Sequence, residues 1–200
     1  MRRARRPAIC NLYSLTPKRD HVGRFFRVSH NRTVAFEPVN AIFPRHVAPV
    51  VRQSEDGERE IVLMNWGFFR LEKGKAPRSV TNVRDDQIRT NPFWRDSFQK
   101  RRCLVPASCF CEPNGDVKPA TWRWFALKDE GDHRPLFAFP GIWRRYQGPV
   151  KKGWSQRRHR NLFVPDDHAQ SSGGHHQSRA HAGAAHARGR IPDLDWGHRR

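Results

Sequence analysis

The sequence predicts an α+β fold built on a mainly antiparallel β-sheet that closes into a barrel, with short helices beside it. Three observations support this prediction. Short apolar runs separated by turn residues recur along the first 164 residues, and only two segments have the features of a helix. The length of 200 residues suits one domain with a tail, and no internal repeat is present.

Six segments are expected to be strands. Arg59–Trp66 follows a turn at Glu55-Asp56-Gly57, and Thr121–Leu127 alternates after a possible hairpin turn at Asn114-Gly115. The other expected strands are Val47–Arg52, Arg102–Val105, Cys109–Glu112 and Leu136–Trp143.

Two segments are expected to be helices. The first spans Pro17–Val28. The second runs to Gln99 from Asn91, a residue type that caps helix N-termini, and Pro92 then suits the first helical position.

The amino-acid composition changes near residue 164. From Pro165 to Arg200 the large apolar residues are only Ile191, Leu194 and Trp196, and six of the eleven His lie there. Such a segment buries too little apolar surface to offset its chain entropy, so we expect residues 165–200 to form a disordered tail.

The net charge points to a polyanionic partner. It is 38 − 19 = +19, and residues 1–164 carry +18 of it. Nucleic acid is the expected partner, and a merely basic protein without such a partner is the alternative. No apolar run reaches the roughly 18 residues of a membrane span, and the Arg-rich start lacks the apolar region of a secretory signal.

Cysteine spacing argues against a disulfide framework and against zinc. The four Cys are Cys10, Cys103, Cys109 and Cys111. The Cys109-x-Cys111 pair is too tight for the usual zinc pair, and no second pair follows. We therefore expect no metal, no cofactor and a reducing cytoplasmic setting.

Four polar residues are candidates for chemistry. Glu112 ends an apolar strand, where desolvation raises a carboxyl pKa toward the range useful for proton transfer; the alternative is an exposed turn residue. Asn82 could hold a substrate and Arg84 could bind phosphate, although Arg84 also fits a solvated strand position. Cys10 could be a core residue, a nucleophile or a processed N-terminus.

Several short motifs, in this order, resemble the SRAP family (SOS response-associated peptidase, abasic-site processing proteins). The resemblance covers residues 10–143. The motifs are Cys10-Asn11-Leu12-Tyr13-Ser14, Phe43-Pro44, Ala48-Pro49-Val50-Val51-Arg52, Asn65-Trp66-Gly67, Thr81-Asn82-Val83-Arg84, Arg102-Cys103-Leu104-Val105-Pro106, Phe110-Cys111-Glu112 and Gly141-Ile142-Trp143.

The resemblance implies a barrel-like SRAP fold and a covalent chemistry. Family members expose Cys as their first residue, and its amine and thiol together trap the aldehyde of an abasic site as a thiazolidine. This implies that Cys10 is the nucleophile, that Asn82 positions the sugar or the cysteine, and that Glu112 moves protons. Arg84 would bind phosphate. Trp66 and Pro49 would offer apolar faces to unstacked bases, or alternatively serve the core.

The implied partner is single-stranded DNA that contains abasic sites. The resemblance also implies DNA repair in the SOS response, with hydrolase (peptidase) and lyase assignments, in a bacterial-type cytoplasm and on the nucleoid when bound. We expect a monomer without membrane contact. A non-catalytic basic nucleic-acid-binding module, descended from such a protein, is the alternative.

Two features depart from the family pattern. Nine residues precede Cys10, with Ile9 in the place of the family's initiator Met, and they make the Cys10 nitrogen an amide. We expect residues 1–9 to be absent from the mature fold, through a start at position 9 or through trimming; an inactive copy is the alternative. The family's later strands and its His are also missing, and codons for Val164–Gln170 and Ala180–His186 read one base later allow family-like peptides. We therefore infer a frameshift near residues 160–164.

The tail as written should show no protected structure. Hydrogen exchange should find no strong amide protection across residues 170–195, and deletion of residues 165–200 should change the melting temperature little. Strong protection there would show a folded tail and contradict the frameshift inference.

Overall fold

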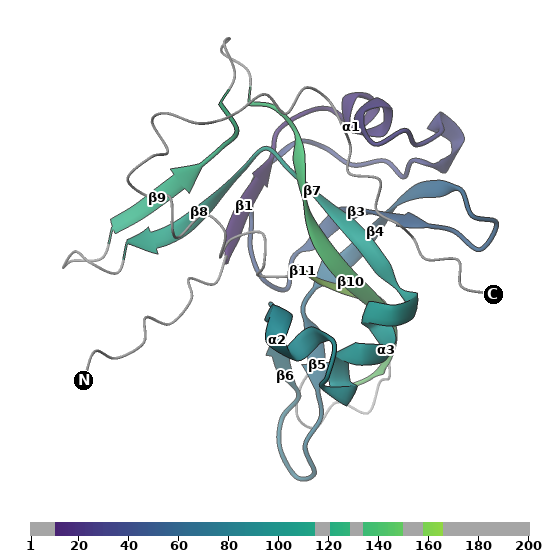
Figure 1. Ribbon diagram of the computed structural model, residues 1–200, viewed down its shortest axis with the longest axis vertical. Helices are drawn as coiled ribbons and strands as arrows, with labels where there is room; N and C mark the ends of the chain where they lie inside the picture. Colours follow the sequence, from purple (N-terminus) through teal and green to yellow (C-terminus); the bar gives the residue numbers. More distant parts are fainter. Residues whose placement is uncertain (1–10, 115–120, 129–133, 150–157, 166–200) are drawn as a thin grey trace.

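The computed structural model describes residues 11–114, 121–128, 134–149 and 158–165. Cys10, the segment 1–9 and the tail from residue 166 onward lie outside these ranges, so the expectations for them remain predictions. The described chain contains a curled β-sheet, a second sheet beside it, two helices and a two-stranded sheet at one end, and a further helix at the opposite end (Figure 1).

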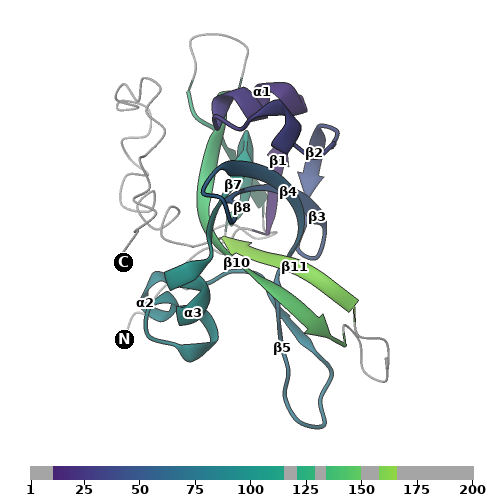
Figure 2. The same cartoon turned by 90° about the vertical axis from the view of Figure 1, so that its right-hand side faces the viewer.

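The largest sheet has five strands in the order β10-β11-β4-β3-β7, with β7 paired again to β10. These strands are β3 (Val47–Gln53), β4 (Arg59–Trp66), β7 (Arg102–Ala107), β10 (Phe137–Gly148) and β11 (Arg158–Pro165). All their pairings are antiparallel except that of β11 with β4. Figure 2 shows β10 and β11 running side by side as a long ribbon.

The sheet is curled rather than evenly closed. The ladder between β11 and β4 has two residue pairs, and so has the ladder between β3 and β7, whereas β3 and β4 share seven. The predicted α+β class with a mainly antiparallel sheet is confirmed. Full closure into a barrel is not confirmed. The β11–β4 and β3–β7 pairings are so short that the sheet is barrel-like, with only two residue pairs at each of these two positions.

A second sheet carries the candidate residue Glu112. Its order is β2-β1-β8-β9, and all three pairings are antiparallel. The strands are β1 (Leu12–Leu15), β2 (Val39–Ile42), β8 (Cys109–Asn114) and β9 (Thr121–Phe125). In Figure 1, β8 and β9 extend away from the curled sheet, with β9 at the outer edge.

The helices are short. They are α1 (Arg19–Phe25), the 3-10 turn η1 (His30–Arg32), α2 (Asp85–Ile88) and α3 (Pro92–Lys100). Helix α3 begins as predicted, because the Asn91 side chain accepts a hydrogen bond of 2.9 Å from the Phe93 backbone N–H. Beside α2 and α3, at the end of the molecule away from α1, β5 (Phe68–Arg70) pairs with β6 (Arg78–Val80) (Figure 1).

The six predicted strands all form, and five of them have shifted ends. Arg59–Trp66 has the predicted bounds, whereas β10 continues five residues beyond Trp143 to Gly148. The hairpin turn predicted at Asn114-Gly115 is wrong at its first residue, because Asn114 still pairs with Thr121 in the β8–β9 ladder. Gly115 lies outside the described residues. The predicted first helix, Pro17–Val28, is shorter and spans only Arg19–Phe25.

The core lies between the two sheets. It includes Tyr13 and Leu15 from β1, Val50 from β3 and Trp66 from β4, each at most 1% exposed. A smaller hydrophobic cluster, which includes Phe68 of β5 and Trp94 of α3, forms the core of the end that holds α2 and α3. No described helix is long and apolar enough to cross a membrane.

An arginine belongs to this smaller cluster. The Arg144 guanidinium lies 4.2 Å above the Phe68 ring and 4.3 Å above the Phe93 ring, and it donates to the Phe69 carbonyl at 2.9 Å. Burial lowers the pKa of Arg144 to about 10. The side chain stays charged at neutral pH and joins β10 to β5 and α3.

Candidate functional site

Glu112 is a buried carboxylate in the middle of the second sheet. It sits on β8 with 8% of its surface exposed, so the alternative of an exposed turn residue is wrong. Strand β1 flanks β8 on one side and β9 on the other. In the β9 ladder, Glu112 lies opposite Arg123, a solvent-exposed residue.

Strand β1 brings the start of the described chain to Glu112. Leu12 pairs with Cys111, Tyr13 with Phe110 and Ser14 with Cys109. The same register continued by one residue sets Asn11 opposite Glu112. Cys10 itself lies outside the described residues. It precedes Asn11 directly in the sequence, so the described chain begins one residue after it.

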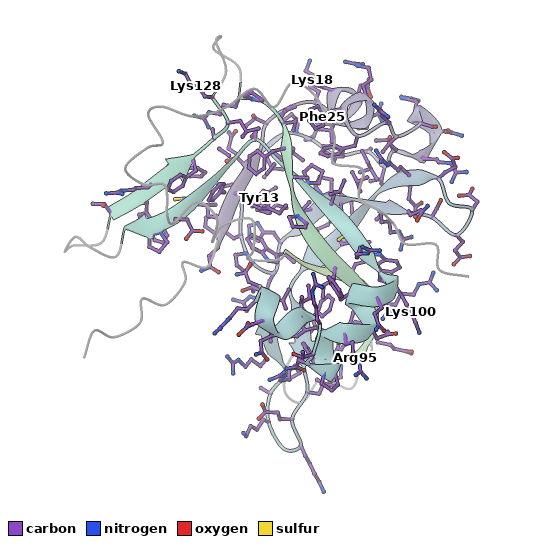
Figure 3. The ribbon with its side chains drawn as sticks, in the orientation of Figure 1. Tyr13, Lys18, Phe25, Arg95, Lys100 and Lys128 are labelled. Carbon is purple, nitrogen blue, oxygen red and sulfur yellow. The ribbon has the colours of Figure 1, made fainter. Side chains whose placement is uncertain are left out.

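A chain of contacts connects Asn82 to the same strand. The Tyr13 ring lies 5.3 Å from the Trp66 ring, on the side of β1 that faces the curled sheet (Figure 3). The Trp66 Nε1–H donates to the Thr81 carbonyl at 2.6 Å, and the Asn82 Nδ2 donates to Thr81 Oγ1 at 3.4 Å. Trp66 thus fixes the backbone that carries Asn82 relative to β1.

Gly67 permits the turn between Trp66 and β5. Its φ is +114°, a conformation that L side chains rarely adopt, and a Cβ added there would meet Ser79 Oγ at 2.5 Å. The glycine in the Asn65-Trp66-Gly67 motif is therefore required by the backbone that holds Trp66.

Two residues predicted to contact DNA are in the interior. Trp66 is 1% exposed, and Pro49 on β3 is also buried. Neither can offer a face to an unstacked base in this conformation, so that expectation is corrected. The core role, which the sequence left open as the alternative, is the one their burial favours.

Arg84 remains at the surface. Its side chain is 58% exposed and pairs with Asp86, with 2.7 Å between Arg84 NH2 and Asp86 Oδ2. An exposed ion pair of this kind contributes little to stability, so the guanidinium can exchange Asp86 for a phosphate at low cost. Arg84 precedes α2 and follows Asn82 by two residues, which keeps it near the candidate site.

The three described cysteines are poor nucleophiles. Cys103, Cys109 and Cys111 are buried. Burial raises the pKa of Cys103 and of Cys111, and the negative charge of Glu112 raises the pKa of Cys111 further. Because the thiolate is the reactive form, these positions disfavour attack on an electrophile, and Cys10 is left as the candidate thiol.

Arg123 is a residue that sequence reasoning missed. The alternation Thr-Trp-Arg-Trp-Phe predicted a strand but could not say which strand it pairs with. The observed register places Arg123 beside Glu112.

Among the described residues, no group of three or more His, Cys, Asp or Glu is arranged to hold a metal ion.

The chain belongs to the SRAP family. The family model described as "SOS response associated peptidase (SRAP)" matches residues 9–162, which is most of the chain. The match includes Asn82, Arg84 and Glu112, and it begins at the residue before Cys10. No curated protein matches the chain.

Solved bacterial structures share the fold. A protein from Bordetella bronchiseptica matches with a TM-score of 0.59 and 19% identity, over 78% of this chain and 71% of that one. A protein from Bacteroides thetaiotaomicron matches with a TM-score of 0.59 and 18% identity, over 78% of this chain and 67% of that one. A phage-related protein from Bordetella bronchiseptica has a TM-score of 0.50 and 16% identity, over 78% and 68%. At these identities the similarity concerns the fold.

Proposed function

We propose that this protein recognises abasic sites in single-stranded DNA and bonds covalently to them through Cys10. The observation that carries the proposal is the burial of Glu112 on the strand paired with β1, into which Cys10 leads. A carboxylate held in this position can serve a reaction at the Cys10 amine and thiol. The excess of positive charge suits a DNA strand, whose phosphates supply affinity without sequence preference.

The chemistry requires a free amine and a free thiol on Cys10. The amine attacks the aldehyde carbon of the opened abasic sugar, and loss of water from the adduct gives an imine. The thiol then adds to the imine carbon and closes a five-membered thiazolidine, while its proton ends on the ring nitrogen. The net change is loss of one water molecule. Glu112 would accept a proton from the attacking amine and donate it to the departing hydroxyl group, and in the reverse reaction it would accept a proton from the attacking water.

Asn82 and Arg84 are proposed to place the substrate. An amide at Asn82 can donate to the sugar hydroxyl and accept from the Cys10 amine, and Trp66 holds its backbone through Thr81. Arg84 would bind a phosphate beside the lesion in place of its exposed partner Asp86.

The proposal requires that Cys10 be the N-terminal residue of the active form. With residues 1–9 attached, the Cys10 nitrogen is an amide and cannot form an imine. A start at position 9 followed by removal of the initiator, or proteolytic trimming, would expose it. The family match beginning at residue 9 supports a functional start there. A peptidase activity of the kind the family is named for would serve the same trimming.

Two forms of the chain test the proposal. A form that begins at Cys10 should give a denaturation-resistant adduct with an abasic single-stranded oligonucleotide, whereas the chain that begins at Met1 should give none. The control is Cys10→Ala in the shorter form, which keeps the amine and lacks the thiol. An adduct of equal stability with Cys10→Ala would overturn the thiazolidine proposal.

A non-catalytic nucleic-acid-binding module is the second candidate. The amide at Cys10 in the chain that begins at Met1 favours it, because the charge that binds DNA remains while the covalent step is blocked. Salt-dependent binding by both forms, without any adduct from the Cys10 form, would favour this candidate.

A further inference from the structure

Strand β9 carries three large aromatic side chains that are exposed to solvent. All five of its residues are exposed, with Trp122 at 61%, Trp124 at 49% and Phe125 at 37%. Tryptophan is highly buried on average, and clustered exposed apolar groups mark surfaces that bind a partner. The strand lies at the outer edge of the second sheet and projects from the body of the molecule (Figure 1).

The strand register assigns these side chains to two faces. Phe125 lies opposite Phe110, and their rings stack with centroids 5.1 Å apart and planes 18° from parallel, which confirms the register at the side-chain level. Arg123 therefore shares the Glu112 face of the sheet. Trp122 and Trp124 lie on the other face, two residues apart, and present two successive rings about 6.5 Å apart along the strand.

Strand β9 and the three residues that follow it carry only positive charge. Residues 121–128 contain Arg123 and Lys128 and no acidic residue. Lys128 lies beyond the end of β9 (Figure 3). Exposed tryptophans interleaved with cations are the combination that binds single strands, in which bases stack on the rings and cations contact the phosphates.

We propose that β9 is a base-stacking strand for single-stranded DNA next to the reaction site. Trp122 and Trp124 stack on unpaired bases on one face of the strand, and Arg123 contacts a backbone phosphate on the Glu112 face, so that the DNA passes around this outer edge of the sheet. The inference rests on the proposed function for the identity of the nucleic acid. It commits to this occupant because the chain carries a net charge of +19 and because residues 121–128 hold two cations and no acidic residue.

A second copy of the chain is a weaker occupant for the same edge. Two copies would bring together net charges of +19 each, and the edge strand is five residues long with a cation at its centre. Short edge strands with an inserted charge resist edge-to-edge pairing. These features disfavour self-association of the chain through β9, whereas they do not disfavour binding to a polyanion.

The test uses non-covalent binding, so that it is independent of Cys10. The chain that begins at Met1 is titrated with an unmodified single-stranded oligothymidylate at several salt concentrations. The double variant Trp122→Ala/Trp124→Ala should weaken binding about tenfold or more with an unchanged salt slope, since stacking contributes without releasing counterions. Arg123→Ala should lower the salt slope by about one, as expected for one lost phosphate contact.

Two control variants isolate stacking from general damage. Trp122→Phe/Trp124→Phe keeps aromatic rings and should retain most of the affinity. Leu71→Ala removes a side chain that is 54% exposed on the β5–β6 segment and should leave affinity unchanged. Melting temperatures of all variants should match that of the parent, because the altered side chains are exposed.

Three results would overturn the inference. One is an unchanged dissociation constant for the double alanine variant. Another is an equal loss for Leu71→Ala. The third is a dimer in sedimentation that the double variant abolishes, which would make β9 a self-interface. If instead the Cys10 form makes no adduct while the tryptophan effects appear as expected, the covalent proposal fails and the DNA-binding strand stands.

Discussion

Replacing Glu112 by glutamine should slow adduct formation by the Cys10 form about 100-fold or more, which is the usual contribution of a general acid–base group. Glutamine has nearly the same shape, so the fold should persist. It cannot donate a carboxyl proton to the departing hydroxyl group, and the imine should form slowly. The measurement is the single-turnover rate of adduct formation with an abasic single-stranded oligonucleotide.

The matched control is Glu60→Gln. Glu60 is also a strand carboxylate, paired with Arg52 at 2.7 Å on the curled sheet, and its side chain is 21% exposed. Its replacement should leave the rate unchanged. Equal rates for the parent and Glu112→Gln, with both proteins folded, would remove Glu112 from the mechanism.

The largest stability effect is expected for Trp66→Ala, which should lower the free energy of unfolding by about 3–5 kcal/mol. Trp66 is 1% exposed and packs on Tyr13, and its indole N–H donates to the Thr81 carbonyl. The alanine leaves a cavity between the two sheets and a carbonyl without its donor. Urea denaturation followed by circular dichroism measures the loss.

Trp122→Ala is the control for tryptophan removal in general. Trp122 is 61% exposed, so its truncation should change the free energy of unfolding by about 0.5 kcal/mol or less. Similar losses for the two variants would contradict the assignment of Trp66 to the core and of Trp122 to the surface.

The sequence predicted the strands that have long apolar patterns. Arg59–Trp66 forms β4 with its predicted ends, because a turn precedes it and Gly67 ends it at positive φ. Strands β1 and β2 have four residues each and β5 and β6 three each, too short for a periodic signal. Strand β11 contains Arg158, His159 and Arg160, so its pairing with β10 could not be read from an apolar pattern.

The candidate site could be predicted only in part. The sequence placed Glu112 at the end of an apolar strand and left its burial open, whereas β8 continues to Asn114 and the carboxylate is buried. The burial of Trp66 and the exposure of Trp122 could not be predicted from local sequence. Both residues lie in alternating strands, and only the position of the neighbouring sheet decides which of them is covered. The pairing of Glu112 with Arg123 likewise depends on the β8–β9 register.

The family match bears on the proposed frameshift. It ends at residue 162, inside the interval 160–164 where the codon reading places a change of frame. We propose that the ancestral chain continued from this point in the alternative frame. Restoring that frame should raise the melting temperature, because the regained strands would cover sheet edges and apolar surface.

The Cys10 amine and thiol should together capture an abasic aldehyde. Intact-mass spectrometry of the product formed by the Cys10 form and an abasic oligonucleotide is the decisive measurement. We expect one adduct whose mass is the sum of protein and DNA less one water, with the DNA attached to the peptide that begins at Cys10. Attachment at a lysine, or no adduct from a folded protein with a free N-terminal Cys10, would contradict it.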